Sequence, residues 1–272
     1  MTVDYQLIIE SKEEPVDMKS GLTSMQGVSD AVRSVGEAVL TGKVPERKNH
    51  KSSVRTTLKN SFKGSYGHKF SLDINDQELL EKFRNIGPKI FSEVISYFIG
   101  EALYRDVRVS GSAQDIIDSM SNISDKIIEI LRMSPLKNAH DVTEKFHFNV
   151  KIEHEYNRDT KSIAYFDLDS ARTLRAKRSR DQIIIEASIT RFNILTGNGR
   201  LQLKNADETV AFGFDVNYRD IKIKLKDILL ENMSENNRRG DKDWLCIRLA
   251  VQKMEVSQGK VVKYIIKGFH EK

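Results

Sequence analysis

The chain has 272 residues, of which 39% are hydrophobic and 31% charged, and its formal net charge is +5. This length can bury one large core or two small ones, and we expect two domains. No run approaches the roughly 18 uncharged apolar residues of a membrane span, and a single cysteine excludes both an internal disulfide and a cysteine-based zinc site.

The chain begins with a predicted strand over residues 3–10. Its opening residues, Met-Thr-Val-Asp-Tyr, carry neither a basic start nor a signal-like core, so we expect a cytoplasmic protein. Apolar residues then recur every three or four positions over residues 22–39, which predicts an amphipathic helix. Strands over residues 54–60 and 66–74, joined around Lys63-Gly64, predict a hairpin.

Helical segments follow this hairpin. Two of them flank Gly87-Pro88, a pair that breaks or kinks a helix. Ser112 and Asp115 have the spacing of a capping box, which would open a further helix that ends before Pro135. The order of elements predicts an α+β domain over residues 1–143, a small antiparallel sheet covered by helices.

Residues 144–181 are expected to form a β-hairpin and a basic linker. Apolar residues alternate with polar ones from Phe146 to Ile152, and residues 162–168 read as the returning strand. This hairpin could belong to the domain on either side. Residues 171–181 are rich in arginine and read as the linker.

Strands dominate residues 182–272. They are expected over residues 183–193, 200–204, 209–216, 244–254 and 261–269. A helix is expected between the third and fourth strands, over residues 221–233, and five strands with a helix in that place is the arrangement of an OB-like β-barrel. Cys246 lies in the fourth strand, where we expect it to be buried and unreactive.

Residues 189–201 read Ile-Thr-Arg-Phe-Asn-Ile-Leu-Thr-Gly-Asn-Gly-Arg-Leu, a strand, a short loop, a Gly-x-Gly turn and a second strand. The cold-shock domain has Trp-Phe-Asn followed by Lys-Gly-Phe-Gly-Phe-Ile in the same frame. Phe192, Asn193 and both glycines match, so the stretch resembles the opening hairpin of that domain, a small OB-type barrel that binds single-stranded nucleic acid. The resemblance covers about a third of the chain and implies an OB-like barrel there.

The residues that do the binding in that family are replaced. Arg191, Asn198 and Arg200 stand where the family has Trp, Phe and Phe, the rings on which unstacked bases sit, each worth about 1–3 kcal/mol. Arginine can stack on a base and neutralise a phosphate, so the change predicts weaker binding that depends more on salt. Alternatively, Gly197 and Gly199 serve only a tight hairpin.

Positive charge is concentrated in two segments. Residues 43–69 hold eight Lys and Arg against one acid, and residues 172–180 hold five and no acid. Together they contribute +12, so the rest of the chain sums to −7. Concentrated positive charge attracts phosphates or an acidic partner.

Signatures of enzymes are absent from the sequence. It contains no phosphate-binding loop, dinucleotide fingerprint or nucleophile elbow, and we expect no catalytic activity and no cofactor. The histidines do not have a metal-ligand spacing. Asp167, Asp169 and Glu186 invite comparison with a nuclease site, but Ser188 stands where a lysine would follow, so we expect surface carboxylates and no metal.

We therefore expect a non-enzymatic protein that binds single-stranded or duplex nucleic acid along the barrel and both basic segments. Phe192 either adds a limited base contact or lies in the core. The expected phosphate contacts are basic side chains of the two segments and of the barrel: Lys48, Lys51, Arg55, Arg172, Arg175, Lys177, Arg178, Arg180, Arg191, Arg200 and Lys204.

The alternative is a protein-interaction subunit that docks an acidic partner, and the lost aromatic platform favours it. The two-domain layout also resembles uncharacterised bacterial proteins of mobile or defence-type gene clusters. That resemblance implies a subunit of a bacterial complex, for example in phage defence. Self-association into a homo-oligomer through the helical domain fits either function.

Overall fold

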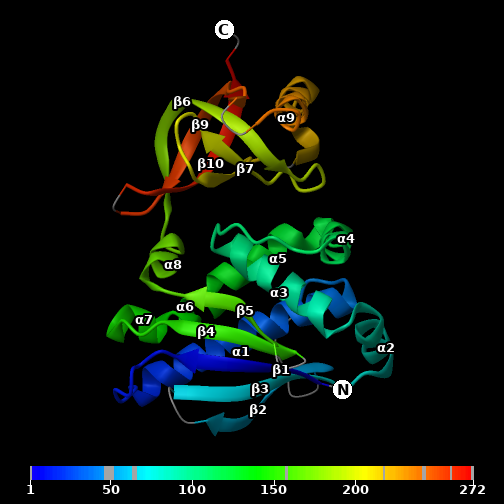
Figure 1. Ribbon diagram of the computed structural model, residues 1–272, viewed down its shortest axis with the longest axis vertical. Coiled ribbons are helices and arrows are strands. Elements are labelled where there is room, and N and C mark those ends of the chain that lie inside the picture. Colours follow the sequence, from blue (N-terminus) through cyan, green and yellow to red (C-terminus); the bar gives the residue numbers. More distant parts are fainter. Residues whose placement is uncertain are drawn as a thin grey trace. The chain divides into compact units, whose positions relative to one another are not determined.

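The computed structural model describes residues 2–45, 52–62, 66–156, 159–216, 218–240, 243–257 and 259–270. The chain divides into two compact units, residues 1–174 and 175–272 (Figure 1). The predicted α+β class is confirmed, with an antiparallel sheet and helices in the first unit and a closed barrel in the second. The division falls inside the segment that the sequence predicts as a linker.

The first unit is built on a five-stranded antiparallel sheet with the order β2-β3-β1-β4-β5. Its strands are β1 (Thr2–Ile9), β2 (Val54–Phe62), β3 (Tyr66–Ile74), β4 (Val150–Tyr156) and β5 (Asp159–Phe166). The β4–β5 hairpin, which the sequence could assign to either domain, thus belongs to this sheet, where β4 pairs with β1. Phe146, expected in a strand, ends a helix before it.

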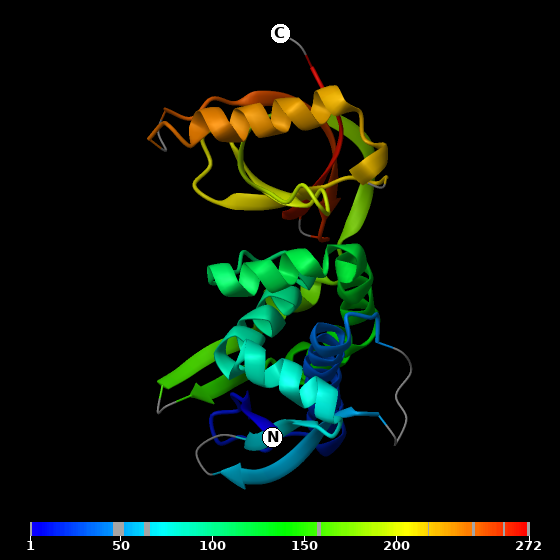
Figure 2. The same cartoon turned by 90° about the vertical axis from the view of Figure 1, so that its right-hand side faces the viewer.

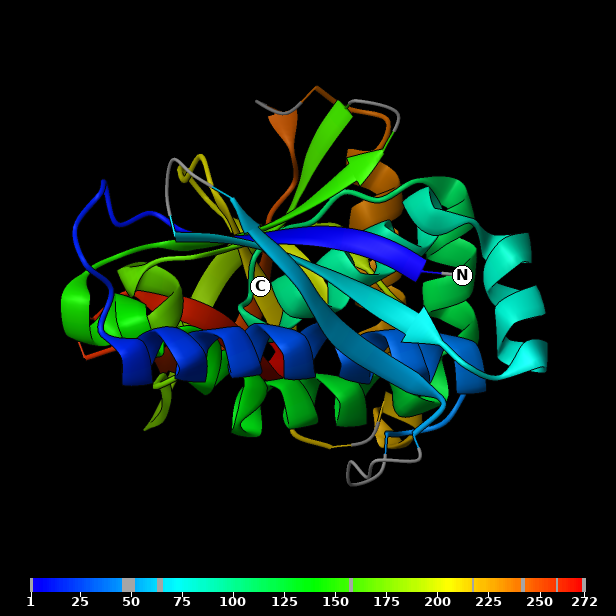
Figure 3. The same cartoon turned by 90° about the horizontal axis from the view of Figure 1, so that it is seen from below.

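Helices cover this sheet, and α1 runs across it as seen from below (Figure 3). They are α1 (Met18–Thr41), α2 (Gln77–Ile86), α3 (Pro88–Ala102), α4 (Gly111–Ser119), α5 (Ser121–Met133), α6 (Pro135–Ala139), α7 (Asp141–Phe146) and α8 (Leu168–Thr173). Val3, Tyr5, Leu7 and Ile9 alternate inward from β1 and share one core with the apolar side of α1. In the described part of the chain, no helix has the length and apolarity that a membrane crossing requires.

The expected capping box at Ser112 is wrong, because Ser110 caps α4 and the helix breaks at Met120 before α5. The reason is a long-range contact. Glu93 of α3 accepts hydrogen bonds from the backbone nitrogen and the hydroxyl of Ser110, at 3.0 and 2.6 Å, and Lys161 donates to its other oxygen at 2.9 Å. Burial raises the pKa of Glu93, but these bonds outweigh it and lower the pKa to about 2.

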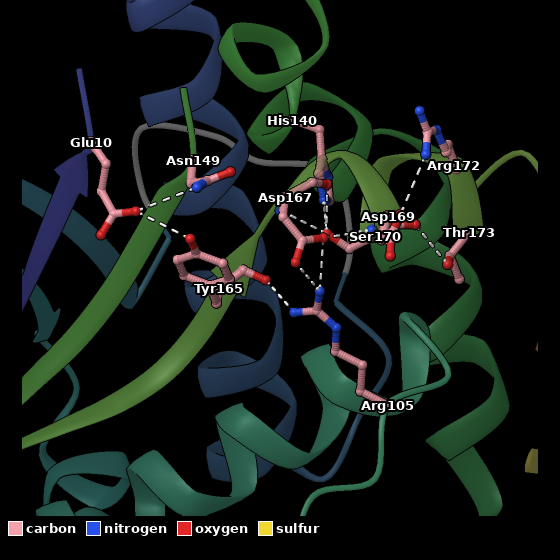
Figure 4. A network of polar contacts seen from close by, with 10 residues as sticks. All are labelled: Glu10, Arg105, His140, Asn149, Tyr165, Asp167, Asp169, Ser170, Arg172 and Thr173. Carbon is pink, nitrogen blue, oxygen red and sulfur yellow. Dashed lines mark hydrogen bonds and ion pairs between the residues drawn. The ribbon is translucent and has the colours of Figure 1, made fainter. Parts of the chain in front are cut away.

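A buried polar network holds α8 against α6 (Figure 4). His140 is fully buried, and its Nδ1 donates to the carbonyl of Leu136 at 2.6 Å, so its Nε2 accepts from the Ser170 hydroxyl at 2.7 Å. Asp167 caps α8 by accepting from the Ser170 backbone nitrogen, and Arg105 donates to both of its carboxylate oxygens at 2.9 Å. Asp167 thus acts as a helix cap.

This network makes the first unit sensitive to acid. Burial, followed by the nearby charge of Arg105, lowers the pKa of His140 from 6.5 to about 4. The unfolded chain therefore binds a proton that the folded chain does not between these two values, so stability is lost as pH falls through this window. We expect a loss of about 2 kcal/mol between about pH 7 and about pH 5 from this residue.

The measurement is urea unfolding of the wild type and of His140→Asn, followed by circular dichroism across this pH range. Asparagine does not titrate, so the variant should be less stable at neutral pH yet lose less on acidification than the wild type. Equal pH dependence in the two proteins would contradict a neutral buried His140.

The second unit is a closed barrel with the strand order β10-β8-β7-β6-β9. Pairing of β9 with β10 closes it. Its strands are β6 (Lys177–Phe192), β7 (Gly199–Leu203), β8 (Thr209–Gly213), β9 (Ile247–Glu255) and β10 (Val261–Phe269). β8 and β10 are parallel and the other pairs antiparallel. This mixed five-stranded barrel is compatible with an OB-like fold.

Helix α9 (Ile223–Asn236) lies between β8 and β9 in the chain and over the barrel in Figure 2. Its Leu225 and Leu229 join the barrel core with Phe212. Residues 177–181, expected in a linker, instead begin β6, where Lys177 lies opposite Glu255 of β9. Cys246 lies just before β9 and is only half-buried, so its expected burial is wrong.

Candidate nucleic-acid interface

The two units differ sharply in charge. Residues 175–272 hold 20 Lys and Arg against 13 Asp and Glu, a net charge of +7. Residues 1–174 hold 24 against 26, a net charge of −2. The whole positive excess of the chain therefore lies in the barrel unit. Electrostatic attraction of a polyanion would be strongest toward this unit.

OB-type barrels bind strands of nucleic acid on the face of their second and third strands, here β7 and β8. Arg200 of β7, expected to contact phosphate, is only 6% exposed. Its Nε donates to the hydroxyl of Thr209 and its Nη2 to the Thr209 carbonyl, both at 2.8 Å. Arg200 thus ties β7 to β8 across the sheet, and a phosphate could reach it only if these bonds opened.

The neighbouring positions of this face also carry polar contacts where the cold-shock domain has rings. Asn198 accepts a hydrogen bond from Lys263 Nζ at 3.0 Å. Gly213 lies beneath that pair, since a Cβ there would come within 2.7 Å of the Asn198 side-chain oxygen. Arg191 lies opposite Arg200 in the β6–β7 ladder and is half-buried.

The backbone requires glycine at both positions of the matching motif, Gly197 and Gly199. Gly197 has φ +76°, a left-handed conformation that side chains disfavour. A Cβ on Gly199 would meet the Arg191 carbonyl at 2.3 Å and the Phe212 ring at 2.5 Å. The tight-hairpin role expected as the alternative is therefore enough to explain them.

Phe192 lies in the barrel core. It is 9% exposed, and its ring centroid is 5.7 Å from that of Phe212 and 5.7 Å from that of Tyr218. Of the two roles expected for this residue, the geometry fits the core role. Tyr218 continues the ring cluster to the half-buried edge, where Lys226 Nζ lies 4.5 Å from its centroid.

Arg178 and Lys267 share one carboxylate on the outer wall. Arg178 Nη2 donates to Asp215 at 2.8 Å and its Nε to Gln252 at 2.8 Å, while Lys267 also donates to Asp215. The hydrogen bond from Lys267 and then that from Arg178 lower the pKa of Asp215 to about 2. Two cations against one carboxylate leave this cluster with one positive charge in excess.

The remaining expected contacts on this unit lie at the surface. Lys204 pairs with Glu186 at 2.6 Å, and this bond raises the pKa of Lys204. Arg175, Lys177 and Arg180 are all exposed. These three lie within six residues, Arg175 just before β6 and the other two in its first residues, and so provide the densest exposed positive charge among the expected residues of the barrel unit.

The residues expected from the first unit are placed as follows. Arg172 lies on α8 with its Nη1 3.4 Å from Asp169, and Arg55 is exposed on β2. Lys48 and Lys51 lie outside the described residues. Among the described His, Cys, Asp and Glu side chains, no group of three is arranged to hold a metal ion.

Sequence reasoning missed a hollow on the barrel wall formed by β6, β7 and the start of β9. It has a volume of about 420 Å³, and its lining includes Trp244, Arg248 and Lys204. The sequence placed Trp244 in a strand and gave it no role. A single tryptophan beside exposed basic strand positions was the available signal.

Comparison of the chain with protein-family models, curated proteins and solved structures found no match. The closed mixed barrel agrees with the fold that the cold-shock resemblance implied. Any likeness of the whole chain to a family stays a prediction.

Proposed function

We propose that this protein binds nucleic acid without catalysis, through the barrel unit of residues 175–272. The observation that carries the proposal is the net charge of +7 on an OB-like barrel, against −2 for the rest of the chain. Such an excess provides a sequence-independent attraction to phosphates through the release of counterions.

Phosphate contacts come first from Arg175, Lys177 and Arg180, because they are exposed and closely spaced. The excess charge of the Arg178–Lys267–Asp215 cluster adds to them. Arg200 contributes mainly by holding β7 and β8 together. Affinity that rests on phosphates in this way is strongly dependent on salt.

The test is fluorescence anisotropy of the full chain with labelled single-stranded RNA, single-stranded DNA and duplex DNA at increasing salt. We expect log affinity to fall linearly with log salt, with a slope of about −2 to −4 for single strands, which corresponds to three to five phosphates. Absence of binding at the lowest salt, or an affinity that salt does not change, would contradict the proposal.

A second candidate is a subunit that docks an acidic protein partner. It is favoured by the β7–β8 face, where Asn198 and Arg200 stand in place of stacking rings and are hydrogen-bonded to Lys263 and Thr209 of the protein itself. Polyglutamate of matched charge distinguishes the two functions. Nucleic-acid binding predicts that polyglutamate competes poorly with a labelled oligonucleotide, whereas the second candidate predicts that it binds at least as tightly.

A further inference from the structure

The hollow on the β6–β7–β9 wall combines an aromatic ring with charges of both signs. Its volume of about 420 Å³ falls within the range of small-molecule sites in proteins. Trp244, Lys204, Arg248, Glu186 and Gln202 are among its lining residues. Gln202 lies between Ser188 of β6 and Thr209 of β8 in the sheet, so the hollow borders the β7–β8 face to which the cold-shock resemblance pointed and extends toward β6 and β9.

The backbone beside Trp244 is held in place by buried amides. The next residue, Leu245, donates its backbone N–H to Asn236 Oδ1 at 2.7 Å. Its carbonyl accepts from Asn232 Nδ2 at 2.8 Å, from Asn236 Nδ2 at 3.0 Å and from Ser188 Oγ at 2.9 Å. Asn232 and Asn236 are 5% and 3% exposed on α9, so they fix the chain at the rim of the hollow.

The charges are arranged around one carboxylate. Glu186 lies opposite Arg248 in the β6–β9 ladder and accepts a hydrogen bond from Lys204 at 2.6 Å. The lining holds two cations, Lys204 and Arg248, and one carboxylate, so one positive charge is in excess at the hollow. Gln202 and the carboxylate supply polar atoms of the kind that pair with the edge of a nucleobase.

We propose that this hollow is a nucleotide site in which one base stacks on Trp244 and its phosphate is bound by Arg248. The proposal rests on the function proposed above and deepens it, because a base can enter only from a single strand or as a free nucleotide. Bases of a duplex are already stacked and paired. The fixed backbone beside Trp244 reduces the entropy cost of such stacking.

Trp244 is the only tryptophan of the chain, so its emission reports on this hollow alone. The experiment titrates the full chain with oligouridylate, oligothymidylate, uridine monophosphate and duplex DNA, and follows tryptophan emission and anisotropy together. We expect the single strands to quench Trp244 over the same concentrations at which anisotropy rises, and duplex DNA to leave its emission unchanged. Equal quenching by uridine monophosphate would assign the site to a free nucleotide.

Two variants at Trp244 sharpen the test, with anisotropy as the readout. Trp244→Ala removes the ring and should weaken single-strand binding about tenfold, whereas Trp244→Phe keeps a ring and should retain most of the affinity. Salt-sensitive binding with unchanged emission and an unaffected Trp244→Ala variant would overturn the nucleotide site while leaving the proposed function standing. Absence of any binding by anisotropy would instead overturn the proposed function itself.

Discussion

Replacement of Arg175, Lys177 and Arg180 together by glutamine is expected to weaken single-strand binding about a hundredfold at about 0.1 M salt. Each lost phosphate contact removes about 0.7 from the slope of log affinity against log salt for a single strand, so the slope should become shallower by about two. All three side chains are exposed, just before β6 or in its first residues, so the barrel should keep its fold. Salt-titrated anisotropy measures both quantities.

The matched control removes the same charge from the first unit. Lys19, Lys89 and Lys126 are exposed on α1, α3 and α5, where alanine is a good helix former. Their replacement by alanine should leave affinity and slope close to those of the wild type. If the control variant weakens binding as much as the barrel variant does, net charge alone determines binding and the barrel has no special part in it.

Gly27→Ala is expected to destabilise the first unit by about 3 kcal/mol. A Cβ at Gly27 would lie 2.1 Å from the backbone nitrogen of Ala139 and 2.5 Å from the carbonyl oxygen of Pro135, so α1 and α6 would have to move apart. The contacts are with backbone, which cannot rotate away as a side chain could. For a unit of this size the loss corresponds to a fall in melting temperature of about 6–12 °C, measured by circular dichroism.

Gly111→Ala provides the control for this prediction. Gly111 opens α4, and a Cβ there would meet nothing within 4 Å. Alanine favours helix over glycine by up to about 1 kcal/mol, so this variant should be as stable as the wild type or slightly more stable. If Gly27→Ala had the same melting temperature as Gly111→Ala, the close approach of α1 and α6 would be contradicted.

Much of the fold could be predicted because local patterns decided it. β3 and β10 occupy the predicted residues 66–74 and 261–269, since alternating apolar residues bounded by turns leave few other choices. α1 ends where Gly42 adopts φ 67°, as a glycine after an apolar stripe predicts. The order of strands and one helix in residues 182–272 was sufficient to predict a five-stranded barrel.

Contacts between distant residues could not be predicted. Ser110 caps α4 because Glu93 fixes it, and this carboxylate is 17 residues away in the sequence. Arg200 read as a surface cation, but its guanidinium bonds across the ladder to Thr209. Both cases depend on which side chains the fold brings together, and no local spacing records that.

The sequence predicted the positive charge of the candidate site but did not predict the hollow beside it. The basic start of β6 was visible as a run of arginines, and its exposure follows from its polar composition. The hollow at Trp244 depends on Asn232 and Asn236 of α9, whose side chains are hydrogen-bonded to the backbone of the next residue, Leu245. Periodicity placed Asn232 on the expected helix of residues 221–233, and Asn236 lay beyond its expected end.

The central claim, that the barrel unit is the part that binds nucleic acid, is tested most directly by photocrosslinking. The full chain is irradiated with thiouridine-substituted single-stranded RNA, and the crosslinked peptides are identified by mass spectrometry. Our account predicts crosslinks within residues 175–272, at the start of β6 and around Trp244. Crosslinks confined to residues 1–174, or none at all, would contradict it.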